Sequence, residues 1–212
     1  MLDLIDFTPD VLAAAPGCPG FTAKRAVLAA AIEFAEMTWC LQSEHDPFDL
    51  EAGIAEYELD APYSQRITGI INVRINGEAI DPATVAEKDR GKTTWRTETA
   101  QYPDCFLRDK SRTITTLKMY PLPLADVDDA VTTLIASTLK RDAVKIPDEF
   151  GENYFEAIVA GATSRVLFQP GQPWGDIQIA PAYRNIFLGR AYSARNQVMG
   201  DTLRRTVSSK VF

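Results

Sequence analysis

The chain of 212 residues contains a single histidine, His45. One histidine excludes a metal site that needs two imidazole ligands. A Ser/His/Asp or Cys/His catalytic arrangement would have to use His45, and the sequence has no Gly-x-Ser-x-Gly nucleophile motif. Because His45 lies in the polar stretch Gln42–Pro47, we expect it in an exposed loop rather than in an active site.

Cysteine is also scarce. Cys18, Cys40 and Cys105 lie far apart and are odd in number, so they form neither a disulfide framework nor a zinc ligand set. We expect small, semi-buried thiols in a reducing compartment.

Long apolar runs are absent. No run approaches the roughly 20 residues that a membrane span needs. The segment 1–7 is acidic where a secretory signal would be basic, so we expect no signal peptide. There is no internal repeat, low-complexity segment or Ser/Gly linker. With 46% apolar and 24% charged residues, the composition indicates a soluble globular protein with one core, or one domain with an insertion.

Charge is distributed unevenly around the net value of −7. Residues 1–60 hold 12 acidic and 2 basic residues, residues 61–150 hold 13 of each, and residues 151–212 hold 4 and 7. This balance argues against a dedicated nucleic-acid binder. It suits a protein partner or a second copy, in which acidic surface meets basic surface. The alternative is a solvated acidic face without a partner.

The N-terminal part predicts two helices. Thr8-Pro9-Asp10 is typical of a helix start, and the segment 16–20 ends that short helix. A longer helix follows over 21–41, because apolar residues recur there at steps of three and four. They are Val27, Ala30, Ala31, Phe34, Thr38 and Leu41.

The middle of the chain changes to a period of two. Segments 54–59, 67–75, 105–108, 113–120 and 130–139 read as short strands, and Asn76-Gly77 predicts a hairpin turn. Strands without long helices between them favour an antiparallel sheet. We expect a short helix to start at Asp81-Pro82, and we interpret the carboxylates of Asp126, Asp128 and Asp129 as turn residues.

The last third predicts a helical hairpin. One helix begins at Pro147 and runs to Phe168, with Ile158, Ala162, Arg165/Val166 and Phe168 on one face. The segment 169–174 stops it, and a second helix covers 179–199. The face of that helix is expected at Ala180, Tyr183, Phe187, Ala191, Ala194 and Val198. Pro170, Gly171 and Trp174 fit a corner between helices, and Tyr183 and Phe187 fit core or subunit-interface aromatics.

These elements predict an α+β fold. An antiparallel helical bundle would be formed by residues 1–45 and 146–199, with residues 46–145 as an inserted antiparallel β-rich subdomain. Residues 200–212 form a basic tail with apolar side chains. That tail either frays or acts as a docking arm that orders on a partner. Its candidate contact residues are Arg204, Arg205, Val207, Lys210, Val211 and Phe212.

One segment matches a loosened nucleotide-binding pattern. Ala86–Thr93 ends in Gly91-Lys92-Thr93, which would make Lys92 and Thr93 the residues that a nucleotide-dependent enzyme uses. A true phosphate-binding loop is Gly-rich and follows a buried strand. Here Glu87 and Asp89 would repel phosphate, so we interpret the segment as an exposed charged turn.

Short motifs also occur along the chain in a recognisable order. The first motifs are Pro16-Gly17-Cys18-Pro19, then Glu33-Phe34 and Thr38-Trp39, then Tyr120-Pro121-Leu122-Pro123. They are followed by Pro147-Asp148-Glu149, then Ala162, Arg165 and Leu167, then Pro170-Gly171-Gln172-Pro173-Trp174, then Ala180, Tyr183, Arg184 and Phe187. In this order the chain resembles, over nearly its whole length, the head-to-tail adaptor (neck) proteins of tailed bacteriophages.

The resemblance implies structural work in the virion neck, without catalysis and without a cofactor. Such subunits are made in the host cytoplasm and form a ring, usually of twelve, beneath the portal protein. Carried onto this chain, the helices at 21–41, 147–169 and 178–199 would build the ring wall. The tail 200–212 would clasp the portal ring, and the β insertion would face outward or toward the next tail component.

In that setting DNA passes through the channel without specific binding, and no membrane is involved. Tight phosphate contact would slow DNA passage, which agrees with the acidic net charge. Two alternatives stay open: another neck or tail component, such as a tail-completion or stopper protein, and a nucleotide-binding enzyme using Ala86–Thr93.

Overall fold

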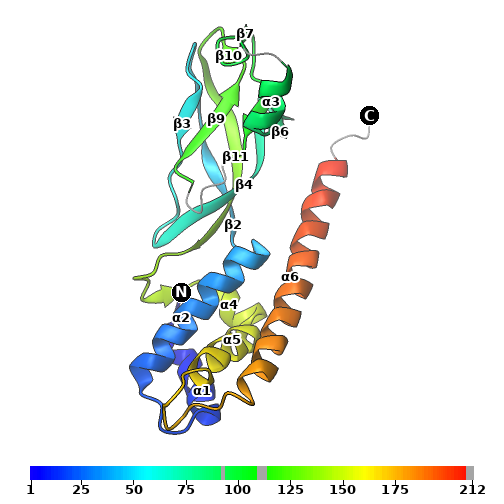
Figure 1. Cartoon of the computed structure of the whole chain (residues 1–212). Helices are drawn as coiled ribbons and strands as arrows, with labels where there is room; N and C mark the ends of the chain where they lie inside the picture. Colours follow the sequence, from blue (N-terminus) through cyan, green and yellow to red (C-terminus); the bar gives the residue numbers. More distant parts are fainter. Residues whose placement is uncertain (92–93, 109–113, 209–212) are drawn as a thin grey trace. The chain divides into compact units, whose positions relative to one another are not determined.

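The computed structural model describes residues 1–91, 94–108 and 114–208, with side chains to residue 200. The protein is mixed α+β, and the chain divides into two compact units. The helical unit comprises Met1–Cys40 and Leu139–Phe212, and the β unit comprises Leu41–Thr138. The helical unit is therefore assembled from both ends of the sequence (Figure 1).

The N-terminal part of the helical unit has the two expected helices. Strand β1 (Leu2–Asp3) and a 3₁₀ turn (Leu4–Phe7) lead into α1 (Thr8–Ala14) and α2 (Gly20–Thr38). Pro9 lies at the start of α1, where its missing N–H costs nothing. Helix α2 ends at Thr38 rather than at the expected Leu41, because Trp39 has a left-handed φ of 55° that prevents another helical turn.

The C-terminal part differs from expectation at one point. After β12 (Lys145–Ile146), which pairs antiparallel with β1, the expected single helix is two helices, α4 (Asp148–Asn153) and α5 (Phe155–Leu167). Tyr154 breaks them apart with φ −129° and ψ 12°. Its ring lies 4.8 Å from the ring of Phe34. Aromatic packing therefore stabilises a bend where Gly151 and Asn153 give weak helix propensity.

Helices α2, α5 and α6 (Ala180–Ser208) pack against one another. Phe34 of α2 is fully buried, and its ring meets those of Phe150 and Phe187 at 6.3 and 6.0 Å. The expected face of α6 is confirmed, because Ala180, Phe187, Ala191 and Ala194 are buried. Tyr183 and Val198 are half-buried.

The β unit is built from two four-stranded sheets. One has the order β2-β11-β4-β5, from Gln42–Leu50, Val127–Leu139, Gln65–Ile75 and Glu78–Ala79. The other has the order β3-β9-β8-β6, from Glu56–Glu58, Thr116–Tyr120, Cys105–Leu107 and Asp81–Ala83. A short pair, β7 (Thr99–Ala100) with β10 (Leu122–Pro123), completes the described strands.

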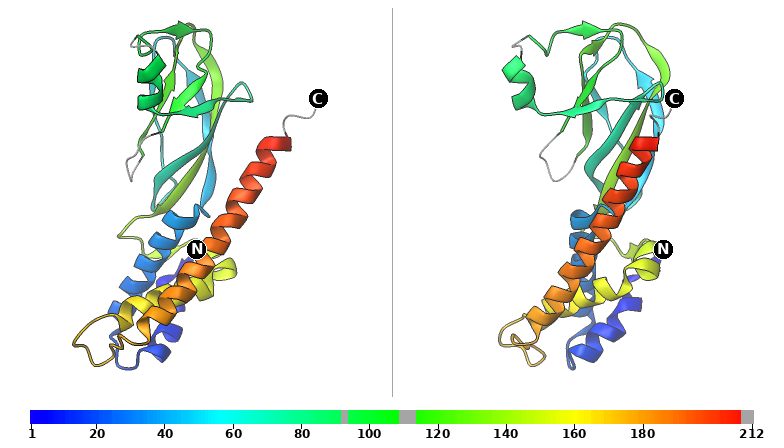
Figure 2. Two further views of the ribbon diagram at one scale, coloured as in Figure 1. Left: turned by 45° about the vertical axis from the view of Figure 1, so that its right-hand side comes forward. Right: turned by 90° about the vertical axis from the view of Figure 1, so that its right-hand side faces the viewer.

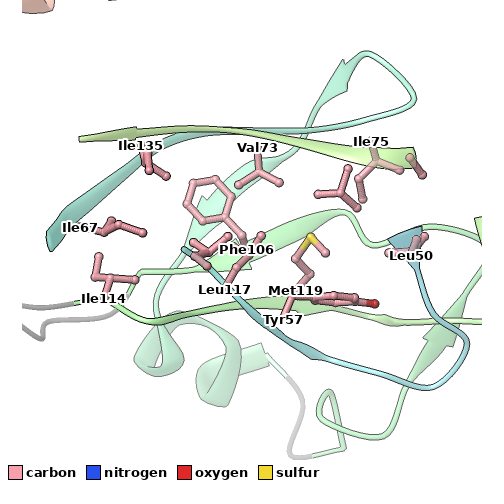
Figure 3. Close-up of a cluster of buried hydrophobic side chains, with 13 residues drawn as sticks. Leu50, Tyr57, Ile67, Val73, Ile75, Phe106, Ile114, Leu117, Met119 and Ile135 are labelled. Atoms are coloured by element: carbon pink, nitrogen blue, oxygen red, sulfur yellow. The ribbon is translucent and has the colours of Figure 1, made fainter. Parts of the chain in front are cut away.

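The core of this unit lies between the two sheets. Figure 3 shows Ile67, Val73, Ile75 and Ile135 from one sheet facing the other. The facing side chains include Tyr57, Phe106, Leu117 and Met119. Strand alternation produces this two-layer core, since every second side chain on each strand points inward.

Most of the described pairs of neighbouring strands are antiparallel, as expected, but two short strand pairs are parallel. Strands β6 and β8 pair in parallel, as do β7 and β10. The expected hairpin turn is confirmed: Asn76 and Gly77 have φ of 51° and 84° between β4 and β5. The expected helix at Asp81-Pro82 is wrong in position, because Asp81–Ala83 is strand β6 and α3 covers Val85–Gly91.

The sequence expectation for His45 is also wrong. His45 lies in strand β2 opposite Thr133 and is half-buried. Its ring meets Phe48 edge-on at 5.8 Å, and its Nε2 accepts the N–H of Asp60 at 3.2 Å. The imidazole is thus part of the sheet rather than of a loop.

The chain enters and leaves the β unit side by side. The N–H of Ser137, near the end of β11, donates to the carbonyl oxygen of Leu41 at 2.9 Å. An insertion with neighbouring ends can be accommodated without disturbing the unit that receives it.

Candidate interaction surface of the helical unit

The connection between α5 and α6 contains three of the predicted site residues. Gly171 has φ of +75°, a conformation that favours glycine. Trp174 is half-buried, and its Nε1 donates to Gln169 Oε1 at 3.2 Å. Pro170 lies next to Gly171 in the same turn. These residues shape the stop after α5.

Asp176 lies in the turn that precedes α6, which begins at Ala180. Its N–H donates to the carbonyl oxygen of Leu167 at 2.9 Å, and its Oδ1 accepts the N–H groups of Gln178 and Ile179 at 2.9 and 3.1 Å. A short polar side chain that accepts from the backbone amides just after it stabilises such a turn. Asp176 was not among the residues expected at this helix start, although an Asp shortly before a helical pattern is a recognisable start signal.

The two predicted aromatic residues lie in different surroundings. Phe187 is fully buried inside the helical unit, so its ring belongs to the core rather than to an exposed surface. Tyr183 is half-buried, one turn earlier on α6. Of the two, only Tyr183 has accessible surface for a partner.

A charged network connects the three long helices. Arg184 of α6 donates to both carboxylate oxygens of Glu33 on α2, at 2.5 and 2.8 Å. Arg165 of α5 donates to the same carboxylate. The hydrogen bond from Arg184, together with the two positive charges, holds the pKa of Glu33 below its ordinary value, against the opposing effect of burial. The network ties the N-terminal helix to the C-terminal hairpin.

A hollow of about 550 Å³ lies beside this network, lined by Glu33, Arg165, Arg184, Phe168 and Pro181 among others. The expected face of α5 is confirmed at Ile158, Ala162 and Val166, but it is wrong at Phe168, which is 61% exposed. Phe168 lies just past the last residue of α5, where helical periodicity no longer directs its side chain.

Further exposed apolar residues follow on the same connection and on the first turns of α6. They are Ile177, Ile179 and Ile186. Exposed apolar side chains close together in the sequence are typical of a segment that contacts another macromolecule. The α5–α6 connection is therefore the candidate interaction surface of this unit.

The end of α6 departs from the expected boundary. The helix does not end at Met199 but continues through Gly200 to Ser208, which is 29 residues in all. Arg204, Arg205 and Val207 thus lie on a helix. Lys210, Val211 and Phe212 lie outside the described residues. A single glycine inside a helix costs only about 1 kcal/mol, which strong helix formers on either side offset.

The segment with the nucleotide-binding pattern does not have the geometry of a phosphate loop. Residues 85–91 form helix α3, and Lys92 and Thr93 lie outside the described residues. Thr84 caps the helix: its N–H donates to Glu87 Oε2 at 2.7 Å, and its Oγ1 accepts the N–H of Glu87 at 3.3 Å. The described part of the segment, through Gly91, is thus helical rather than an extended Gly-rich loop.

The other candidate groups have structural roles. Asp126 Oδ1 accepts the N–H of Ala52 at 2.7 Å, and the N–H of Asp129 donates to Asp49 at 2.8 Å. Asp128 and Asp129 lie in β11 rather than in a turn. The three cysteines are buried thiols. Within the described part of the chain, no cluster of three His, Cys, Asp or Glu side chains could hold a metal ion.

Among the described residues, no helix has both the length and the apolar character needed to cross a membrane. Comparison with models of known protein families gave no match, and comparison with curated protein sequences gave none either.

Proposed function

We propose that this protein is a structural subunit of the neck of a tailed bacteriophage, a head-to-tail adaptor without enzymatic activity. The order of motifs along the chain supports the proposal. Helices α2, α5 and α6 would form an antiparallel bundle, and the bundles of neighbouring copies would form the wall of a homo-oligomeric ring. The β unit is the inserted subdomain, directed outward or toward the next tail component.

The observation that carries the proposal is the length of α6. Among the side chains that the structure describes, which extend to residue 200, the last buried one on α6 is Ala194, and those of residues 195–200 are exposed or half-buried. Yet the helix continues to Ser208. A helix of about 14 residues is marginal in water without packing. An extension of this length and basic composition is suited to docking on a partner.

The partner that we propose is the portal protein ring, reached through Arg204, Arg205, Val207, Lys210, Val211 and Phe212. A dodecameric ring would continue the portal channel, and genomic DNA would pass through it without specific binding. The net charge of −7 supports this part of the proposal, because a negatively charged wall repels DNA phosphates. The protein would then reside in the virion neck.

The experiment is native mass spectrometry of the purified chain with its cognate portal ring. We expect several copies to load, near one per portal subunit. Deleting Leu203–Phe212 should abolish loading and leave the thermal unfolding transition in place, because it removes none of the buried side chains described on α6, which lie at or before Ala194. A matched control replaces the exposed pair Lys24 and Arg25 by Glu, which alters charge elsewhere in the helical unit.

Two outcomes would contradict the proposal in different ways. If the deletion variant loads as well as the wild type, the docking role of the tail is wrong. If the wild-type chain ignores the portal but binds a tail-side component, the protein is another neck or tail component, such as a stopper.

A further inference from the structure

A second hollow, of about 450 Å³, lies in the β unit on the outer face of the sheet β3-β9-β8-β6. Strand β9 alternates across this sheet: Leu117 and Met119 are buried in the core, whereas Lys118 and Tyr120 line the hollow. A hollow of this size can accept one or two side chains of a partner. We name it the Trp95 pocket, after the aromatic residue at its wall.

The wall of the Trp95 pocket is held rigidly. Trp95 is 5% exposed, packs edge-on against Tyr120 at 4.7 Å, and donates from Nε1 to Asp89 Oδ1 at 2.8 Å. The same oxygen accepts Arg96 Nη1 at 3.0 Å, and the guanidinium of Arg96 lies 4.2 Å from the centre of the Trp95 ring. Arg96 is thus oriented from two sides before any partner binds.

Basic side chains outnumber acidic ones in the lining of the pocket, although Arg96 pairs with Asp89 beside it. Its lining includes Arg96, Arg108 and Lys118, and among the described lining residues Glu56 is the sole acid. Glu56 is engaged by Lys118 at 2.6 Å. Arg108 is exposed, and Arg96 is 51% exposed. Two accessible guanidinium groups beside an apolar wall favour a carboxylate-bearing segment, since guanidinium pairs with carboxylate in bidentate geometry.

The chain itself carries such a segment. Residues 41–60 contain seven acidic residues and neither lysine nor arginine. Strand β2 is the edge of its sheet, and Glu44, Asp46 and Asp49 on it are exposed. Pro47 and a register shift beside it hinder the addition of another strand. The edge therefore offers carboxylates rather than backbone hydrogen bonds.

We propose that the Trp95 pocket of one copy binds the acidic edge strand β2 of a second copy, with Arg96 and Arg108 contacting Glu44 and Asp46. Pocket and strand are different surfaces of one chain, so the contact is head-to-tail and can repeat from subunit to subunit. The inference rests on the proposed function in that it names the contact between neighbouring subunits of the ring.

Sedimentation of the full-length chain without portal, at up to about 1 mM protein, tests the contact. At about 20 mM salt the wild type should associate, and added salt should weaken the association because exposed charges are screened. The variant R96E/R108E should associate at least about tenfold more weakly. The variant E44K/D46K should be weakened equally, and an equimolar mixture of the two variants should regain association.

Controls separate the contact from general charge effects and from misfolding. K24E/R25E changes the net charge by the same amount on the helical unit and should associate like the wild type. Arg108→Glu alone avoids the Asp89 contact that Arg96 makes, so its loss of association would not reflect an altered fold. A monomeric wild type, an unaffected R96E/R108E or a mixture that stays monomeric would each overturn the inference.

The outcome is independent of portal loading. If the mixture of R96E/R108E and E44K/D46K stays monomeric while the wild type loads onto the portal, this contact is wrong and the adaptor proposal stands. If the mixture associates while the wild type does not bind the portal, the contact stands and the adaptor proposal is wrong.

Discussion

At the scale of single residues, Gly161 of α5 lies where this helix packs closely against α6 and α2. A Cβ added there would lie 2.5 Å from Cδ2 of Phe187 and 3.0 Å from the Cβ of Ala30. Phe187 is fully buried and has no space to move away. The glycine is therefore needed for packing, in spite of its low helix propensity.

Gly161→Ala should accordingly destabilise the protein by about 1–3 kcal/mol, because overpacking outweighs the gain in propensity. Gly189→Ala is the matched control, since a Cβ at this helical position in α6 meets nothing within 4 Å. We expect that variant to be more stable than the wild type by up to about 1 kcal/mol. Urea unfolding measures the change in the free energy of unfolding of each variant. If both variants change it by the same amount and in the same direction, α5 and α6 pack less closely than described.

Glu33 is the second residue with a defined energetic role. Its side chain is 25% exposed and accepts from both Arg165 and Arg184. Replacing it by Gln leaves two neighbouring guanidinium groups without their counter-charge. We expect Glu33→Gln to cost about 1–3 kcal/mol at pH 7, as measured by urea unfolding. Glu156→Gln is the control, because the pair Glu156–Arg190 is 74% and 61% exposed and should contribute less than about 1 kcal/mol.

The direction of the pKa shift adds a pH dependence to this prediction. The folded-state pKa of Glu33 is below its ordinary value of 4.5. Its stabilisation is therefore fully present above that ordinary value and is lost as the pH falls through the lowered one. The stability difference between wild type and Glu33→Gln should shrink over this acidic range. A difference that stays constant down to the lowest pH would mean that hydrogen-bond geometry, rather than charge, holds the helices together.

At the scale of elements, the two parts of α6 differ in how far their described side chains pack against other helices. Residues up to Ala194 bury side chains against α2 and α5, and Figure 2 shows the helix continuing well past that region. We expect amide hydrogen exchange in the isolated chain to be slow before Ala194 and fast beyond about Gly200, since unpacked helix opens readily. Portal binding should slow exchange in the second part, and uniform protection along α6 in the isolated chain would contradict this division.

The sequence predicted those helices and strands whose spacing of apolar residues matches the side chains that are buried. The faces of α2 and α6 and the strand with its Asn76-Gly77 turn follow from periodicity and turn chemistry. Strand β2 was missed because it lies at a sheet edge, where exposed carboxylates and Pro47 hide the alternation. The break at Tyr154 was missed because it depends on packing with Phe34, which lies far away in the sequence.

The candidate surfaces were predictable only in part. Pro170, Gly171 and Trp174 mark the turn after α5 through ordinary turn chemistry. The partnership of Glu33 with Arg165 and Arg184 could not be read from spacing, because the residues lie more than 130 positions apart. The Trp95 pocket has the same origin: Arg96 and Lys118 reach one hollow only after β9 and the segment before β7 are brought together.

At the scale of the whole molecule, the β unit has its own core and its own neighbouring ends. We expect residues 41–138 expressed alone to fold cooperatively, because Leu41 and Ser137 already hydrogen-bond to each other. Circular dichroism with thermal melting measures this. Residues 139–212 alone should not fold, since α5 and α6 would lose the buried face of α2. A β fragment that stays unfolded would show that its core depends on the helical unit.

The side-by-side entry and exit of the β unit also determine how that unit responds to mechanical load. Two backbone connections, rather than one, join the β unit to the rest of the chain. One leads into β2 and the other leads out of β11, at the same end of the sheet. A pull transmitted through both connections runs along two backbones in parallel. A pull that separates the connections would instead open the β2–β11 ladder one hydrogen bond at a time, starting at Leu41 and Ser137.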